Sequence, residues 1–281
     1  MNKLILIILI GALTGPFSFA FAATDIGDQL SRKETFSENA WEDFKTSFSW
    51  IFKGGVNQFR TKSSLYILAA GAPALWYAFE EDKEYAQKNR TKGKPPGWIR
   101  SFHGISVAST FSIQSFALYS ISHWSDNEKL RMYAMELFAA TNLTLAETFL
   151  FSFIPIHERP DTSDLSHWET NFRGDSSFPS GHMVPFAVWT YKTFQYYGPL
   201  WALLPASAFA VSSYQRVREN KHYLSDVVGS IILSGLASEG VRVTANYHDN
   251  HPVYKWMYEH EVSVGGYILD GNKYLYTSAS F

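Results

Sequence analysis

Three short blocks of the chain contain residue types that together could transfer a phosphoryl group without a metal ion. They are Arg159-Pro160, then Pro179-Ser180-Gly181-His182, then Arg216 with His222 and Asp226. Guanidinium groups bind phosphate oxygens as a bidentate fork and stabilise charge that develops in the transition state. A histidine with a carboxylate behind it can act as nucleophile, and a second histidine can protonate a leaving group. We therefore expect the three blocks to meet at one site.

The order and internal spacing of these blocks resemble the type 2 phosphatidic acid phosphatase and vanadium haloperoxidase superfamily, in particular bacterial acid phosphatases. The family signature runs KxxxxxxRP, then PSGH, then SRxxxxxHxxxD. In this chain the resemblance covers about Ser152 to Asp226. Each block alone has a simpler explanation, such as a capped turn or a surface His-Asp pair, but their combination is specific. The resemblance implies an all-α fold with a helical-bundle core.

The resemblance also implies a role for each residue of the site. His222 is the nucleophile that forms a phosphohistidine, and Asp226, one helical turn further on, can fix its tautomer. His182 is the general acid, which protonates the leaving oxygen and then accepts a proton from water. The reaction implied needs no cofactor and no metal ion. The phosphate is bound by Arg159, Arg216, Ser180 and Gly181.

Two positions depart from the family signature. Ser152 stands where the family has its first lysine, and Gln215 stands where the family has a serine before the second arginine. The missing lysine removes one phosphate-binding cation, and the candidates to replace it are His157, Lys221 and Arg218. Because both histidines, the aspartate and both arginines of the signature are present, we expect an active enzyme.

The overall composition limits the class of protein. The 281 residues include 24 Lys and Arg against 26 Asp and Glu, a formal net charge of −2, and no cysteine. This balance does not favour a nucleic-acid partner, and the lack of cysteine excludes disulfides and thiolate metal sites. His248, Asp249 and His251 form a small cluster, but their spacing is not a recognised ligand pattern, so a polar loop is expected there.

The beginning of the chain has the pattern of a secretory signal peptide. Residues 1–22 contain Lys3, an apolar run from Leu4 to Leu13, and small residues before a cleavage position after Ala22. Export places the protein in the periplasm or cell envelope. Later stretches are rich in aromatic and small residues, but the mean hydropathy of the chain is only −0.14, and a membrane span needs about 20 predominantly apolar residues. Buried helices of a soluble protein are therefore favoured, and integral membrane placement is the less favoured alternative.

The remaining chain divides into three parts. Residues 23–62 mix aromatic and charged residues at helical spacing, which predicts an amphipathic segment that covers the core or, alternatively, contacts a membrane surface. Residues 63–246 form the predicted helical phosphatase domain, with helices expected at 101–122, 128–153, 184–196, 200–217 and 224–243. Residues 247–281 form a tail in which Asp270-Gly271 separates two alternating segments, the pattern of a β-hairpin.

These features favour hydrolysis of phosphate esters or anhydrides, including lipid phosphates, in the bacterial envelope through a phosphohistidine. The expected partner is a phosphorylated small molecule or a lipid phosphate, with membrane-surface contact as an open alternative. Two other functions remain as alternatives. One is a vanadate-dependent haloperoxidase, which would use the same site residues. The other is a non-catalytic envelope protein that binds phosphate or lipid head groups, suggested by Ser152 and Gln215.

Overall fold

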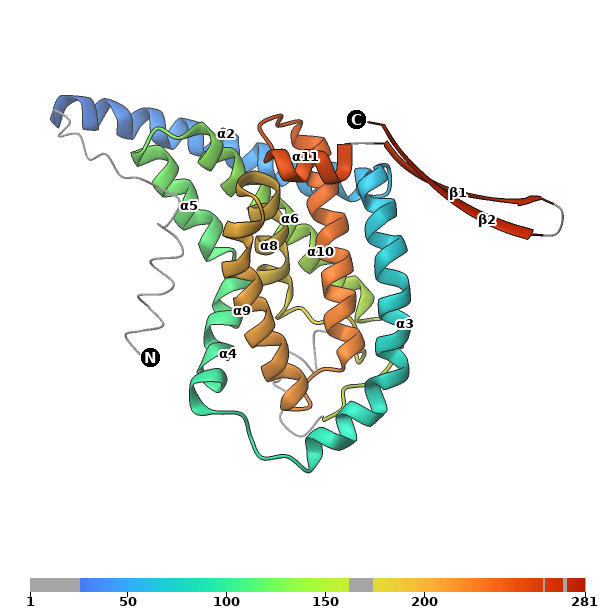
Figure 1. The fold of residues 1–281 in the computed structure, drawn as a ribbon. Coiled ribbons are helices and arrows are strands. Elements are labelled where there is room, and N and C mark those ends of the chain that lie inside the picture. The colour runs from blue at the N-terminus through green and yellow to red at the C-terminus, as the bar shows by residue number, and fades with distance from the viewer. Residues whose placement is uncertain (1–25, 162–173, 260, 270–271, 281) are drawn as a thin grey trace.

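The protein is a bundle of helices followed by a short two-stranded segment (Figure 1). The computed structural model describes residues 26–161, 174–259, 261–269 and 272–280, with side chains for 39–161 and 174–257. The predicted signal peptide, residues 1–22, lies outside the described residues. The helical class that the sequence predicted is confirmed. The helices are α2 (Ile26–Asn57), α3 (Lys62–Arg90), α4 (Gly97–Ser109), α5 (Ile113–Trp124), α6 (Glu128–Phe151), α8 (Val184–Tyr197), α9 (Pro199–Arg218), α10 (Leu224–Ala245) and α11 (Pro252–Glu259).

Helix α10 lies at the centre of the bundle and packs against α2, α3, α6 and α8. Small residues allow the close approach: a Cβ added at Gly240 would lie 2.2 Å from the backbone oxygen of Gly54 on α2. Of the helices described, α10 alone is long and apolar enough to cross a membrane, and 78% of its most apolar window is buried within the bundle. The same length and composition are typical of the core helix of a soluble protein.

Capping residues set where several helices begin. Thr61 Oγ1 accepts a hydrogen bond from Ser64 N at 3.0 Å at the start of α3, and Asn127 Oδ1 accepts one from Leu130 N at 2.9 Å at the start of α6. The sequence predicted one helix over 101–122, and the structure divides it into α4 and α5. The break falls at Ser112, whose φ of 56° is left-handed and incompatible with a continuous helix.

A buried ionic cluster joins α6, α8 and α10 near the end of α10 that is remote from Leu224. Lys192 Nζ donates to Glu136 Oε2 at 2.6 Å, to Gln195 Oε1 at 2.8 Å and to the backbone oxygen of Ser238 at 2.8 Å. Gln195 Nε2 in turn donates to Glu239 Oε1 at 2.6 Å. Lys192 and Glu136 are both fully buried, so each depends on its partners to offset the loss of water.

The N-terminal and C-terminal segments flank this bundle. Helix α2 covers the core through Trp50, which is buried against α6 and α10. After α11, β1 (Glu261–Leu269) pairs antiparallel with β2 (Asn272–Ser280), with Glu261 opposite Ser280 and Leu269 opposite Asn272. No side chain of these strands is described, so the hairpin tail and the proposed domain boundaries stay predictions.

Candidate active site

The turn between α9 and α10 brings Arg216 next to His222. Both Lys221 N and His222 N donate to the backbone oxygen of Arg216, at 2.9 and 3.3 Å. The turn closes because Asn220 adopts a left-handed φ of 53°, which asparagine tolerates better than most residues. Arg216 is buried at the last turn of α9. The sequence spacing between the second arginine and the second histidine thus corresponds to one compact turn.

His222 and Asp226 form a buried pair at the start of α10. His222 Nδ1 lies 3.0 Å from Asp226 Oδ2, and the two side chains are fully buried. Tyr223 N also donates to Asp226 Oδ2, at 2.9 Å, which fixes the carboxylate in the first turn of the helix. With Nδ1 as the donor to an ionised carboxylate, Nε2 of the neutral ring holds the lone pair. Burial raises the pKa of Asp226 to about 7, against the lowering effect of its hydrogen bonds from Tyr223 and Ser177.

The Pro-Ser-Gly-His block lies against the same end of α10. Ser180 N donates to the backbone oxygen of Asp226 at 3.2 Å, and Ser230 Oγ donates to the backbone oxygen of Ser180 at 2.9 Å. Ser180 Oγ is buried and has no hydrogen-bond partner among the described residues. A buried hydroxyl in that state is suited to a ligand oxygen. His182 lies just before α8, and its ring centroid is 6.3 Å from that of His222.

The first arginine completes the set that the sequence predicted. Arg159 is half-buried, and its positive charge lowers the pKa of Asp226 in opposition to burial. Arg90 Nη2 on α3 donates to the backbone oxygen of Pro160 at 3.2 Å, which holds the Arg-Pro segment to the bundle. The structure therefore brings the three blocks to one end of the bundle, where α3, α8, α9 and α10 meet.

Ser152 has a structural contact in place of the family lysine. Its hydroxyl donates to the backbone oxygen of Phe149 at 2.7 Å and accepts from Gly174 N at 3.2 Å, while its backbone oxygen accepts from Ser176 N at 3.2 Å. A Cβ added at Gly174 would lie 2.1 Å from that backbone oxygen. Ser152 thus fixes the start of the segment that leads to Pro179.

The three candidates for the missing cation have other contacts. Arg218 donates to the backbone oxygens of Asn89 and Gly93. Lys221 Nζ lies 3.9 Å from Asp161 Oδ2. His157 lies behind Asp226, with Nε2 3.5 Å from Asp226 Oδ1. The second departure from the signature, Gln215, is buried, and its Nε2 donates to Glu219 Oε2 at 3.3 Å.

The sequence analysis missed several residues around this site. His103 on α4 is exposed, and its ring centroid is 5.6 Å from that of His182. Asp82, Ser177 and Ser225 form a buried polar chain with His157 behind Asp226. No local motif indicates these residues, since their contacts come from segments far apart in the sequence.

Among the residues that the structure describes, no three His, Asp or Glu side chains are grouped as a metal site, and the segment of His248 and His251 is no exception.

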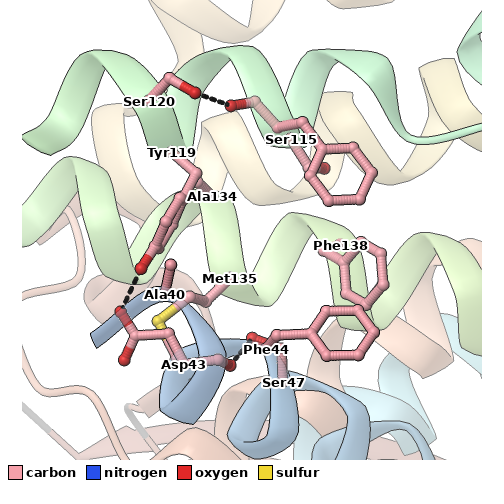
Figure 2. A pocket seen from close by; sticks show the side chains of 11 residues that line it. Ala40, Asp43, Phe44, Ser47, Ser115, Tyr119, Ser120, Ala134, Met135 and Phe138 are labelled. Carbon is pink, nitrogen blue, oxygen red and sulfur yellow. Dashed lines mark hydrogen bonds between the residues drawn. The ribbon is translucent and has the colours of Figure 1, made fainter. Parts of the chain in front are cut away.

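An apolar cavity of about 240 Å³ lies between α2, α5 and α6 and contains none of the site residues (Figure 2). Tyr119 donates to Asp43 Oδ2 at 2.7 Å at its polar edge, and Phe44 packs on Phe138 with ring centroids 5.8 Å apart at its aromatic edge. Because it shares no residue with the three blocks, we do not assign the cavity to the chemistry. The lining residues are Ala40, Asp43, Phe44, Ser47, Ser115, Phe116, Tyr119, Ser120, Ala134, Met135 and Phe138.

Comparison with known proteins agrees with this geometry. Residues 133–248 match the family model of the PAP2 superfamily. The match runs from α6 through the end of α10 and includes all three blocks. This part of the chain is therefore a PAP2 superfamily domain, and the resemblance to the phosphatidic acid phosphatase and haloperoxidase superfamily is confirmed. No curated protein and no solved structure matches the chain.

Proposed function

We propose that the protein is a phosphatase that hydrolyses phosphate esters or anhydrides through a phosphohistidine at His222. The observation that supports this most directly is the buried His222–Asp226 pair, 3.0 Å apart, with the His182 ring centroid 6.3 Å from that of His222. Two-step phosphoryl transfer requires a nucleophile that is oriented by a carboxylate. It also requires a second histidine close to that nucleophile, which can transfer a proton.

The reaction proceeds in two steps. Arg159 and Arg216 bind the nonbridging oxygens, and the hydroxyl of Ser180 and the backbone of Gly181 add donors. His222 Nε2 forms a bond to phosphorus as the bond to the leaving oxygen breaks, and His182 gives that oxygen a proton. Water then attacks the phosphohistidine, His182 accepts its proton, and the P–N bond breaks to release phosphate. Asp226 stabilises the positive charge on the ring of His222 during the first step.

Rapid quenching with a ³²P-labelled phosphate monoester tests this assignment. Wild-type protein should accumulate acid-labile, base-stable label, and His222→Ala should lose both the label and turnover. His182→Ala should slow label formation most for substrates with poor leaving groups, because those need the proton most. His248→Ala is the matched control, since His248 is an exposed histidine outside the site. Turnover that survives unchanged in His222→Ala would contradict the assignment.

The alternatives give different results in the same assays. A haloperoxidase would oxidise halide with vanadate and peroxide and would not hydrolyse the esters. A non-catalytic binder would retain phosphate or lipid head groups and form no covalent label. The intact set of histidines, arginines and Asp226 supports an enzyme over a non-catalytic binder. The haloperoxidase would use the same residues, so the two assays separate it from the phosphatase.

Within this function, we propose an exported enzyme that contacts a membrane surface and accepts lipid phosphates. Phe153 and Ile154 support this, because they are 57% and 50% exposed in the segment that leads to Arg159. Exposed apolar side chains beside a charged phosphate site suit an amphiphilic substrate. On α2, Trp41, Phe48 and Phe52 are also exposed, along the helix for which the sequence left membrane contact open.

A double substitution, Phe153→Ser with Ile154→Ser, tests the lipid preference. The KM for a lipid phosphate in vesicles should rise about tenfold, while the KM for a soluble monoester should stay within about twofold. Trp124→Ser, which alters an exposed aromatic residue at the end of α5, is the control. Equal changes in KM for both substrates would contradict the membrane proposal and leave the phosphatase proposal intact.

Fractionation of the native host with a salt wash tests the proposed envelope location.

A further inference from the structure

A chain of buried polar side chains runs behind Asp226, on the side away from His222. It begins at Asp82, a buried residue of α3. Asp82 Oδ2 accepts from Ser225 Oγ at 2.6 Å, and Asp82 Oδ1 accepts from Ser225 N at 3.0 Å. Ser225 is the residue before Asp226 on α10, so α3 is tied directly to the helix that positions the site.

His157 joins this pair to Asp226. Its Nε2 lies 3.0 Å from Ser225 Oγ, and its Nδ1 lies 2.8 Å from Ser177 Oγ. Ser177 Oγ donates to Asp226 Oδ1 at 3.2 Å, and Ser177 N donates to the backbone oxygen of His157 at 3.0 Å. The order of groups is therefore Asp82, Ser225, His157, Ser177, Asp226.

Counting protons along this chain assigns the state of His157. A serine hydroxyl has one proton to donate. Ser225 uses its proton toward Asp82, so its oxygen accepts from His157 Nε2–H. Ser177 uses its proton toward Asp226, so its oxygen accepts from His157 Nδ1–H. Both ring nitrogens are then donors, which is the hydrogen-bond pattern of an imidazolium.

The charges around His157 agree with that state. Its Nε2 lies 3.5 Å from Asp226 Oδ1 and 3.8 Å from Asp82 Oδ2, so the ring stands between two buried carboxyl groups. Two neighbouring carboxylates away from water repel each other, and the repulsion is relieved by a cation between them or by a proton on one of them. Burial lowers the pKa of His157, and the Asp82 carboxylate opposes this by raising it. Burial is the larger of the two effects, so the pKa of His157 is lowered on balance, and the proton on the ring depends on the two carboxyl groups and the two hydroxyl acceptors.

The other groups that face this ring come from each element packed around it. On α3, Phe79 packs against it with ring centroids 5.5 Å apart. At the start of α10, the Tyr223 ring lies 4.6 Å away, also between centroids. From the segment before Pro179, the Phe178 ring packs against His157 with ring centroids 6.4 Å apart. Among the charged groups, Arg159 lowers the pKa of Asp226. Arg90 lowers the pKa of Tyr223, and Glu158 raises it.

We propose that His157 is a positioning residue for Asp226: as an imidazolium bridging Ser177 and the Ser225–Asp82 pair, it keeps Asp226 ionised and turned toward His222. The catalytic consequence rests on the proposed function, because an ionised Asp226 is what stabilises the cationic ring of His222 as its P–N bond forms. If His157 loses its proton, Ser177 can turn its hydroxyl toward the bare Nδ1, and Asp226 then loses both a donor and a neighbouring charge.

The protonation state of His157 can be measured without any turnover. In protein labelled with ¹⁵N-histidine, the ring signals of His157 are identified by their loss in His157→Gln. At about pH 6, both ring nitrogens of His157 should show the shifts of protonated nitrogen. Asp82→Asn should release the proton at lower pH. A neutral ring with one protonated nitrogen at about pH 6 would overturn the proposal.

Kinetics test the positioning role. His157→Gln should lower kcat at least about tenfold with KM within about twofold, and should move the rising limb of the pH–rate profile to higher pH. Ser177→Ala should also lower kcat and move the rising limb to higher pH. It is a smaller substitution and serves as the second variant if His157→Gln folds poorly. His123→Gln is the control, because His123 is a partly buried histidine packed on Tyr119 away from the site.

These outcomes separate the inference from the proposed function. Loss of melting temperature in His157→Gln and Ser177→Ala, with kcat and the pH limb unchanged in the folded protein, would reduce His157 to a structural residue. If wild-type protein hydrolyses no phosphate compound, the proposed function fails, but the ring ¹⁵N signals still decide whether His157 is an imidazolium.

Discussion

At the scale of single residues, the site depends on carboxyl groups that are kept away from water. Burial raises the pKa of Asp226 to about 7, so the ionised and neutral forms of this group are close in free energy near neutral pH. Its hydrogen bonds from Tyr223 N, Ser177 and His222 all favour the ionised form, which accepts them. Small changes in these donors should therefore have large effects on activity.

The first prediction concerns the pH dependence of activity. In the proposed mechanism the ionised carboxylate stabilises the phosphohistidine, so kcat/KM should rise as pH increases through about 7, the pKa of Asp226. This rising limb of the pH profile reports the coupled titration of the His222–Asp226 pair. Asp226→Asn should abolish this limb and lower kcat about a hundredfold or more, measured by initial rates across pH. A limb that is unchanged in Asp226→Asn would assign it to another group.

The same shift predicts how stability depends on pH. A carboxyl whose pKa is raised in the folded state binds its proton more tightly there than in the unfolded chain. Its contribution to stability is fully present below the unfolded value of 3.8 and is lost as pH rises through about 7. Urea unfolding at several pH values should show wild type losing free energy of unfolding over this range relative to Asp226→Asn. A constant difference between the two would contradict the raised pKa.

Another prediction concerns Ser152, which the sequence alone marked only as a missing lysine. Its hydroxyl is the acceptor for Gly174 N and a donor to Phe149. Ser152→Ala should therefore lower the free energy of unfolding by about 1 kcal/mol. The KM for a phosphate ester should stay within about twofold of wild type, whereas Arg159→Ala should impair both KM and kcat, because only the arginine is expected to touch phosphate.

The residues of the site differ in how far the sequence could predict them. The motif spacing indicated His182, His222, Asp226 and the two arginines, and the structure places them together. Asp82 could not be found in this way, because it lies in the run Glu80-Glu81-Asp82-Lys83-Glu84, which has the composition of a solvated helix face. Only the packing of α3 against α10 turns this one carboxylate inward, toward Ser225.

At the scale of elements, glycines decide how closely the helices approach α10. At Gly240 the obstacle to a side chain is backbone, namely the oxygen of Gly54, so α2 would have to move. Gly104 on α4, in contrast, has nothing within 4 Å of an added Cβ. The close contact between α2 and α10 therefore requires glycine at position 240, whereas a side chain at position 104 would meet no clash.

This contrast gives a matched pair of substitutions. Gly240→Ala should lower the free energy of unfolding by about 2 kcal/mol or more, because a well-packed contact cannot admit the methyl group. Gly104→Ala should raise it by about 0.5 to 1 kcal/mol, because alanine is the better helix former and meets no clash. Both are measured by urea denaturation with unchanged m-values as the check on two-state behaviour. Equal effects would contradict the close α2–α10 contact.

Helical periodicity predicted most elements but not how they are divided. The expected segments 128–153, 184–196, 200–217 and 224–243 correspond to α6, α8, α9 and α10. The division of 101–122 was missed because Thr110, Phe111 and Ser112 continue the same polar and apolar pattern, and the left-handed φ of Ser112 is not visible in residue type. The aromatic stripe of the N-terminal segment predicted α2, and burial of Trp50 shows which face meets the core.

At the scale of the whole molecule, polar clusters occupy both ends of α10. The site lies around Asp226, and the ionic cluster of Lys192, Glu136 and Glu239 lies thirteen residues further along the same helix, which is about 20 Å at 1.5 Å per residue. Both ends rely on buried charges satisfied by specific partners. Among the described residues, the end at Asp226 alone contains a histidine paired with a carboxylate of α10, so the two clusters should have separable roles in catalysis and in stability.

The last prediction tests this separation. Lys192→Met leaves Glu136 buried beside Tyr196 without its cation and should lower the free energy of unfolding by about 3 to 5 kcal/mol. Lys129→Met, which breaks the more exposed pair with Asp249, should cost no more than about 1 kcal/mol. Because the cluster lies far along α10 from Asp226, the folded fraction of Lys192→Met should keep wild-type kcat, pH profile and phosphohistidine label. A loss of kcat in the folded protein would mean that the packing of α6, α8 and α10 transmits strain to His222, and the two ends of α10 would then have to be treated as one unit.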